Sequence, residues 1–108
     1  MTRGDIAIVA YGELGRPRPV VIVQANELGD ATMTIVACPI TSELTGKLPI
    51  RPIVEPDEKN ALRVRSQIMT DRILAVPRER VRQVIGSIDR QSQDHLDRAL
   101  LLVLGLTR

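Results

Sequence analysis

Short apolar runs, separated by segments rich in glycine, proline and polar residues, make up the first half of the chain. Residues 6–11 (IAIVAY) predict a strand, and residues 31–40 (ATMTIVACPI) predict another. Between them, residues 19–25 (PVVIVQA) are β-branched and almost continuously apolar, which is typical of a strand buried on both faces. Loops are expected at residues 12–17 and 41–48, where glycine, proline and polar side chains gather.

The second half of the chain predicts shorter elements and then one helix. Pro49 and Pro52 favour an edge position for the next strand, because proline cannot donate to a central ladder. The two short strands that follow are expected to join or bend near Thr70. In order, these elements are a strand at 49–54, a turn at 57–60, strands at 62–69 and 72–76, a helical turn at 77–82 and a strand at 84–88.

The last part of the chain has the period of an α-helix. Ser92 is expected to cap its start, and Gly105 to end it. Asp94 and Asp97 suit the positive end of the helix dipole. The apolar residues that share one helix face are Leu96, Ala99, Leu100, Val103 and Leu104.

Several strands followed by one helix predict an α+β fold that is mainly β. We expect a small barrel or a strongly bent antiparallel sheet, with the C-terminal helix packed against it. The length of 108 residues suits one modest core, and no linker or internal repeat divides it, so we expect a single domain over residues 1–108.

Composition narrows the function. The chain is 44% hydrophobic and 26% charged, the balance of a folded protein, and its only aromatic residue is Tyr11. The core must therefore be aliphatic, and the usual aromatic platform for single-stranded nucleic acid is excluded. Thirteen of the 15 basic residues are arginine, whose planar fork suits phosphate, although the net charge is only +2.

Most catalytic and cofactor signatures are missing. His95 has no second histidine or cysteine partner for a metal, and Cys38 has the setting of a small buried residue. No phosphate-binding glycine motif or nucleophile elbow occurs, so we expect neither a metal nor a cofactor. Without a signal peptide or an apolar stretch of roughly 20 residues, we expect a cytoplasmic protein and no membrane partner.

Three features could carry chemistry, and each also has a plain structural explanation. Arg18 stands between Pro17 and Pro19, which would fix its backbone for binding an anion or simply stiffen a turn. Thr41 and Ser42 end an apolar strand, where their hydroxyls could donate to a phosphate or close a turn. Ser66 and Asp71 flank a predicted strand, and Asp71 beside Arg72 could be only a surface ion pair.

The ordered set of these motifs resembles the MazF/PemK (Kid) family of toxin endoribonucleases of bacterial toxin–antitoxin systems. No single motif is specific, but the match is collinear over essentially the whole chain. The matching elements are Arg3-Gly4-Asp5-Ile6, then Gly15, Arg18, Pro19, Val20 and Gln24, then Pro39-Ile40-Thr41-Ser42, Ser66, Asp71, Ile85-Gly86-Ser87-Ile88 and Leu104-Gly105-Leu106.

The resemblance implies an SH3-like barrel that forms a homodimer and cleaves single-stranded RNA without a metal. If the family's catalytic positions apply to this chain, Arg18 and Thr41 are the expected catalytic residues. Arg18 would stabilise the developing negative charge and could protonate the leaving oxygen. Attack by the 2′-hydroxyl would leave a 2′,3′-cyclic phosphate and a 5′-hydroxyl end. A cognate MazE-like antitoxin is the expected protein partner. The residues expected to bind RNA are Gly15, Arg16, Ser42, Ser66 and Asp71.

Two departures and two alternative functions accompany the resemblance. The first strand lacks the family's frequent aromatic residue, and the central turn reads Asn60-Ala61-Leu62 where Asn-Gly-Leu is usual, although alanine accepts positive φ poorly. One alternative is a CcdB-like protein that poisons DNA gyrase without catalysis, but the ending Gly105-Leu106-Thr107-Arg108 has no tryptophan of the kind that group uses. The other is a catalytically silent barrel that binds nucleic acid.

Overall fold

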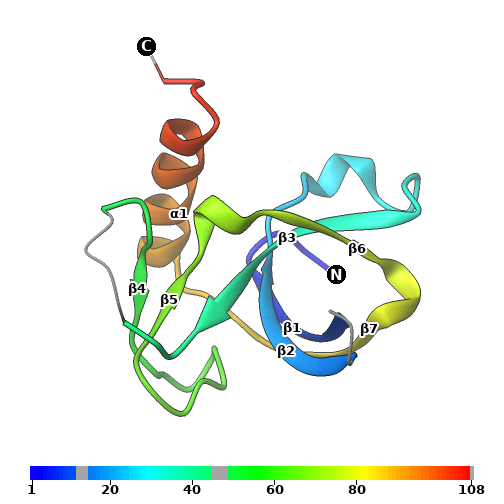
Figure 1. The fold of residues 1–108 in the computed structure, drawn as a ribbon, viewed down its shortest axis with the longest axis horizontal. Helices are drawn as coiled ribbons and strands as arrows, with labels where there is room; N and C mark the ends of the chain where they lie inside the picture. The colour runs from blue at the N-terminus through cyan, green and yellow to red at the C-terminus, as the bar shows by residue number, and fades with distance from the viewer. Residues whose placement is uncertain (12–14, 45–48, 108) are drawn as a thin grey trace.

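The computed structural model describes residues 1–11, 15–44 and 49–107. In this part of the chain, antiparallel strands form a strongly curled sheet, and one α-helix lies at one side of it (Figure 1). The strands are β1 (Asp5–Tyr11), β2 (Arg16–Ile22), β3 (Thr34–Thr41), β4 (Ile53–Val54), β5 (Ser66–Ile68), β6 (Leu74–Pro77) and β7 (Val81–Ser87). The helix is α1 (Arg90–Val103), and single 3-10 turns are η1 (Asn26–Leu28), η2 (Thr70–Arg72) and η3 (Arg78–Arg80).

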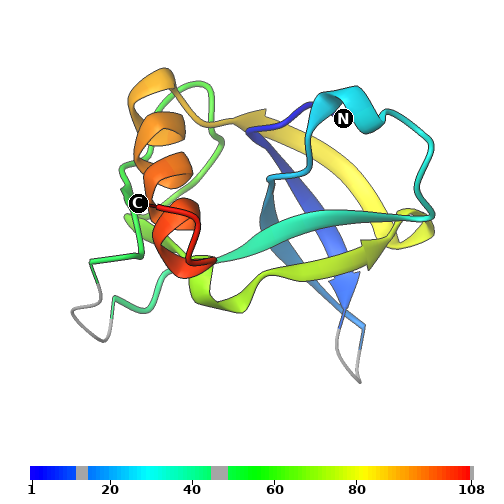
Figure 2. The same cartoon turned by 90° about the horizontal axis from the view of Figure 1, so that it is seen from above.

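Strand β3 organises the sheet. The strands of the sheet follow the order β4-β5-β3-β2-β1-β7, and β6 also pairs with β3. The first half of β3 pairs with β6, and its last residues, Ile40 and Thr41, pair with β5. Seen from above, α1 lies to one side of the curled strands (Figure 2). The fold class predicted from the sequence is confirmed.

The predicted strands are present, with shifted bounds. Strand β2 begins at Arg16, earlier than expected, and ends at Ile22 instead of residue 25. Pro17 and Pro19 are accommodated because the register pairs this part of β2 with β1 only, while β3 joins at Val20. The strand expected at 49–54 is reduced to β4, and the one expected at 62–69 to β5. Residues 12–14 and 45–48 of the expected loops, and the side chain of Tyr11, lie outside the described residues.

The alternation of side chains along the strands creates two aliphatic clusters. Val21 and Cys38 pack with Leu96 of α1, whereas Val20 and Ile22 face a second cluster on the other side of the sheet. The predicted burial of the second strand on both faces is therefore confirmed, as is the burial of Cys38. Desolvation raises the pKa of the Cys38 thiol to about 12.

Helix α1 is capped at both ends, but not at the start by the predicted residue. Asp89 is the N-cap, and its Oδ1 accepts the backbone N–H of Ser92 at 2.8 Å. Ser92 therefore lies three residues after the N-cap, and the predicted N-cap was wrong. Serine and aspartate are both favoured at the N-cap, so residue type alone did not distinguish Ser92 from Asp89. At the other end Gly105, at φ +70°, is confirmed as the stop: its N–H reaches the carbonyl of Leu102, and that of Leu106 reaches Leu101.

The central turn, Asn60-Ala61-Leu62, has a positive φ at its alanine, a backbone conformation that is costly for this residue. Ala61 has φ +56°, the left-handed value that the family's usual glycine would adopt freely. Its neighbour Asn60 is fully buried, and its side chain holds the turn through the N–H of Asp57, the N–H of Leu62 and the carbonyl of Glu55. The side-chain hydrogen bonds of Asn60 thus hold the turn with a positive φ at Ala61.

Candidate functional site

A polar cavity of about 390 Å³ forms where β2, β3 and η2 meet. We call it the arginine pocket, since three guanidinium groups and one carboxylate line it within the described part of the chain. The lining residues are Arg18, Ile40, Thr41, Glu43, Arg51, Met69 and Arg72. The two residues that the resemblance marks as catalytic, Arg18 and Thr41, therefore share one cavity.

Sheet register brings Arg18 and Thr41 together. Strands β2 and β3 pair antiparallel up to Val20 opposite Pro39, and Arg18 and Thr41 each lie two residues beyond that last pair. Arg18 is exposed and pairs with Val9 of β1, which holds its backbone in the sheet. Thr41 is half-buried and pairs with Gln67 of β5.

The hydroxyl of Thr41 takes part in the local turn that the sequence also allowed. Its Oγ1 accepts the backbone N–H of Glu43 at 3.1 Å. A hydroxyl that accepts one hydrogen bond still carries a hydrogen to donate. The turn is therefore compatible with a hydrogen bond donated by the same hydroxyl.

Arg51 is fixed at the pocket by a two-point ion pair. Its Nε lies 2.8 Å from Oδ1 of Asp71, and its Nη2 lies 2.9 Å from Oδ2. The Arg51 side chain is only 12% exposed, against 31% for Asp71. The hydrogen bond from Arg51 is the main cause that lowers the pKa of Asp71, and the charge of Arg72 adds to it.

The chain on both sides of Arg51 is also held. The carbonyl of Ile50 accepts the hydroxyl of the fully buried Thr70, and the carbonyl of Pro52 accepts the N–H of Ile68 at 2.9 Å. Arg51 is therefore presented rigidly, with donors beyond those that Asp71 occupies. The sequence suggested Arg72 as the partner of Asp71. The structure instead pairs Asp71 with an arginine 20 positions earlier.

The residues predicted to bind RNA are placed differently from one another. Gly15, at φ +59°, and the exposed Arg16 stand at the start of β2, next to the strand that carries Arg18. Ser42 is exposed directly after Thr41. Ser66 is buried in β5, where its hydroxyl donates to the carbonyl of Val64, and it does not line the pocket. The RNA contacts of all these residues, and of Asp71, stay predictions.

Sequence reasoning missed Arg51, Arg72 and Glu43 as pocket residues. Arg72 and Glu43 adjoin positions that were singled out, so proximity in the sequence was a usable signal for them. Arg51 had no such signal, because it reaches the pocket only when the segment after β3 folds back against η2.

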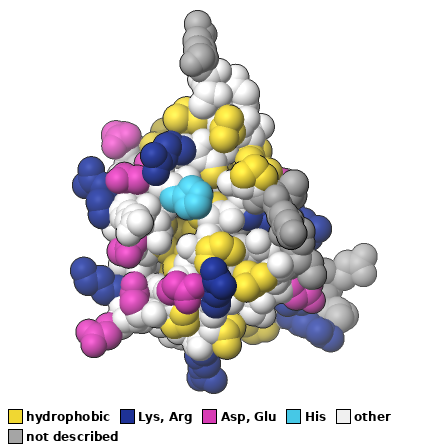
Figure 3. Space-filling view, turned by 90° about the vertical axis from the view of Figure 1, so that its left-hand side faces the viewer, with side chains coloured by type: hydrophobic (Ala, Val, Ile, Leu, Met, Phe, Trp, Pro, Cys, Tyr) yellow, Lys and Arg dark blue, Asp and Glu magenta, His cyan; other side chains and the backbone are white. Residues whose placement is uncertain are grey.

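The single histidine lies elsewhere. His95 is exposed on α1 and lines a separate hollow with Asp57 and Asp89, and Figure 3 shows it at the surface among charged and apolar side chains. Among the described residues, no three histidine, cysteine or acidic side chains gather as a metal-binding group. No described helix is long and apolar enough to cross a membrane.

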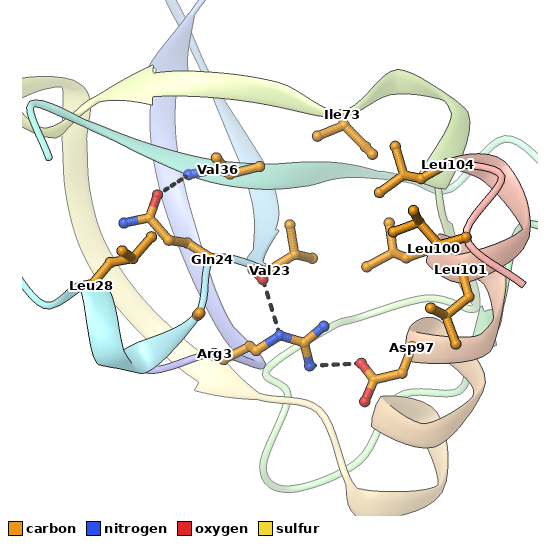
Figure 4. Close-up of a pocket in the computed structure, with 12 residues that line it drawn as sticks. Arg3, Val23, Gln24, Leu28, Val36, Ile73, Asp97, Leu100, Leu101 and Leu104 are labelled. Carbon is orange, nitrogen blue, oxygen red and sulfur yellow. Dashed lines mark hydrogen bonds and ion pairs between the residues drawn. The ribbon is translucent and has the colours of Figure 1, made fainter.

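A larger cavity of about 630 Å³ lies between the sheet and the end of α1, and its lining is mainly aliphatic (Figure 4). Its charged groups are engaged with the protein: Arg3 donates through Nε to the carbonyl of Val23 at 3.0 Å and through Nη1 to Asp97 at 2.6 Å. The arginine of the Arg3-Gly4-Asp5 motif thus joins the start of the chain to the helix. This cavity offers apolar surface, not a set of anion-binding donors.

The described part of the chain therefore combines a curled antiparallel sheet, a C-terminal helix and an arginine- and threonine-lined pocket at the end of β3. The sequence matches the model described as "PemK-like, MazF-like toxin of type II toxin-antitoxin system" over residues 2–104. The chain belongs to this family.

Individual relatives agree with this assignment. The chain is 34% identical over 108 residues to a probable endoribonuclease MazF of Mycolicibacterium smegmatis, and the match covers 98% of each chain. Among solved structures, it resembles a mycobacterial endoribonuclease in complex with its cognate antitoxin, with a TM-score of 0.85, 19% identity and coverage of 100% and 98%. It also resembles the Mycobacterium tuberculosis toxin MazF-mt6, with a TM-score of 0.82, 20% identity and coverage of 96% and 99%. These structures support the fold, and the family match supports the MazF/PemK interpretation over the CcdB-like one.

Proposed function

We propose that this protein is the toxin of a type II toxin–antitoxin pair and acts as a sequence-specific endoribonuclease on single-stranded RNA. The observation that carries the proposal is the presence of Arg18 and Thr41 in one pocket, with Arg51 and Arg72 beside them. Several guanidinium groups in one cavity are suited to binding a phosphodiester. The match to a MazF-like toxin family, and to a relative named as a MazF endoribonuclease, supports RNA as the substrate.

The chemistry follows from what RNA offers and what the pocket holds. The 2′-hydroxyl attacks the adjacent phosphorus, so negative charge builds on the phosphoryl oxygens as the P–O5′ bond breaks. Arg18 is permanently charged and donates to those oxygens, and Thr41 donates from the other strand. The products are a 2′,3′-cyclic phosphate and a 5′-hydroxyl end, and no metal takes part in this scheme.

Partners and place in the cell follow from the same proposal. The antitoxin is a MazE-like protein with a flexible segment that covers the arginine pocket and orders on binding. The homodimer implied by the resemblance would place two such pockets along one RNA groove. Its expected location is the cytoplasm, where messenger RNA is translated.

The test is cleavage of a long single-stranded RNA in EDTA by the wild-type protein, Arg18→Ala and Thr41→Ala. We expect cuts at a recurring short motif with 5′-hydroxyl ends, and a loss of about 100-fold or more in Arg18→Ala. Arg98→Ala, an exposed position on α1 that does not line the pocket, is the matched control and should cleave normally. A DNA strand of the same sequence should stay intact because it lacks the attacking hydroxyl.

A wild-type protein that cuts no RNA would refute the proposal. Inhibition of DNA gyrase would then support the CcdB-like alternative, and RNA binding without cleavage would support the silent barrel. Cleavage of the DNA strand would refute the 2′-hydroxyl mechanism.

A further inference from the structure

The proposed reaction needs a group that removes the proton of the 2′-hydroxyl, and the arginine pocket contains one suitable side chain. Guanidinium groups are always protonated and cannot accept a proton. Ile40 and Met69 have no basic atom. Among the described residues that line the pocket, Glu43 is the one with a carboxylate. This inference rests on the proposed function.

Asp71 is the other acidic residue near the site, but its interactions make it a weak base. Both of its oxygens accept hydrogen bonds from Arg51, at 2.8 and 2.9 Å. A carboxylate that must give up a two-point ion pair to take a proton is a poor proton acceptor. Asp71 is therefore suited to position Arg51 and not to abstract a proton.

Glu43 is held in place through its backbone although its side chain is exposed. Its N–H donates to Oγ1 of Thr41 at 3.1 Å, and its carbonyl oxygen accepts Nε2 of Gln67 at 2.9 Å. Gln67 is itself 3% exposed in β5. The carboxylate therefore starts from a fixed point, two residues from the hydroxyl expected to contact the same phosphate.

We propose that Glu43 is the general base of the cleavage reaction. Its carboxylate takes the proton of the 2′-hydroxyl as that oxygen bonds to phosphorus. The P–O5′ bond breaks with its electron pair on the 5′ oxygen, which takes a proton from a water molecule while the guanidinium of Arg18 stays charged beside it. The proton on Glu43 passes to the hydroxide that is left, so the protein ends the cycle unchanged. Thr41 and Arg51 donate to the phosphoryl oxygens during the transfer.

The experiment compares wild type, Glu43→Gln, Glu43→Asp and the control Glu79→Gln, which replaces an exposed glutamate on η3 outside the pocket. Single-turnover cleavage is measured across acidic to neutral pH with excess protein. Binding is measured separately with a 2′-O-methyl RNA of the same sequence, which cannot react. Thermal unfolding of each variant verifies the fold.

For Glu43→Gln we expect the single-turnover rate to fall by about 10² to 10⁴-fold, while the 2′-O-methyl RNA binds within a few-fold of wild type. The decline of the wild-type rate toward acid pH should disappear in this variant, and Glu43→Asp should recover part of the rate and keep the decline. Glu79→Gln should match wild type throughout.

Two results would overturn the assignment of Glu43. One is an unchanged rate and pH profile in Glu43→Gln. The other is a loss of binding that matches the loss of rate, which would make Glu43 a binding or structural residue. Both require an active wild-type protein, so they are distinct from the failure of the proposed function, which would appear as a wild type that cuts no RNA.

Discussion

Arg51 and Asp71, 20 positions apart, form a two-point ion pair at the arginine pocket, with N–O distances of 2.8 and 2.9 Å. We expect Asp71→Asn to lower RNA cleavage by about 10- to 100-fold, because Arg51 loses the fixed position from which we propose that it donates to the RNA phosphate. Stability should change by about 1 kcal/mol or less, since the pair is partly exposed. Asp94→Asn, which removes the exposed pair with Arg90 outside the pocket, is the control.

The same pair has a defined pH dependence. Arg51 lowers the pKa of Asp71 in the folded state, so the ion pair stabilises the folded protein at pH values above the ordinary pKa of a carboxyl group. This stabilisation is lost as the pH falls through the lowered pKa of Asp71. Unfolding in urea at neutral and acidic pH should show a difference between wild type and Asp71→Asn that shrinks toward acid. An equal difference at every pH would contradict the ion pair.

Gly86 allows β7 to lie against the central turn. A Cβ at this position would stand 2.2 Å from the carbonyl oxygen of Lys59, which also accepts the N–H of Ser87. Gly86→Ala should therefore destabilise the protein by about 1–3 kcal/mol, because the turn must move. Gly105→Ala, where a Cβ meets open space at φ +70°, measures the cost of a positive φ without a clash and should lose less in urea unfolding.

Ala61 offers a stabilising substitution. Its φ of +56° costs an alanine about 1–2 kcal/mol, and glycine relieves this at a smaller entropic cost in the unfolded chain. We expect Ala61→Gly to raise the free energy of unfolding by about 0.5–1 kcal/mol. Ala75→Gly, at an extended position in β6, should change it in the opposite direction. If both variants lose stability in the same unfolding assay, Ala61 is not strained.

The N-cap of α1 is a separate test of the structure. The N–H of Ser92 lowers the pKa of Asp89, so the cap is strongest when the carboxyl is ionised. Asp89→Ala should cost about 1 kcal/mol at neutral pH, and less as acid protonates the wild-type carboxyl. Ser92→Ala keeps the backbone donor and should cost little. If Ser92→Ala were the more costly variant, the cap would be Ser92 after all.

Cys38 is expected to be unreactive in the folded protein. Burial raises the pKa of its thiol to about 12, so almost no thiolate is present at neutral pH. A thiol-specific reagent should therefore react only as fast as the protein opens, and should label one site per chain in denaturant. Rapid labelling of the folded protein would show that β3 is less protected than the structure indicates.

Strand positions followed from sequence because apolar runs and turn residues are local signals. The runs that became β1 and β3, and the helix face around Leu96, could be found this way. The ends of strands and helices were harder to predict from the sequence. The start of β2 at Arg16 depends on pairing with β1, and the N-cap at Asp89 depends on where the chain leaves β7. Both are set by partners that are not adjacent in the sequence.

The sequence by itself determined an aliphatic, mainly β domain with a C-terminal helix, and it drew attention to Arg18 and Thr41 through a collinear set of motifs. Only the tertiary structure decided that these two residues share a pocket, that Arg51 and Glu43 join them, and that Asp71 is occupied by Arg51. Local patterns report the period of a strand or helix, whereas a site is built from side chains that meet across strands and loops. The physical reason is that sheet register and chain reversal, and not sequence spacing, set those distances.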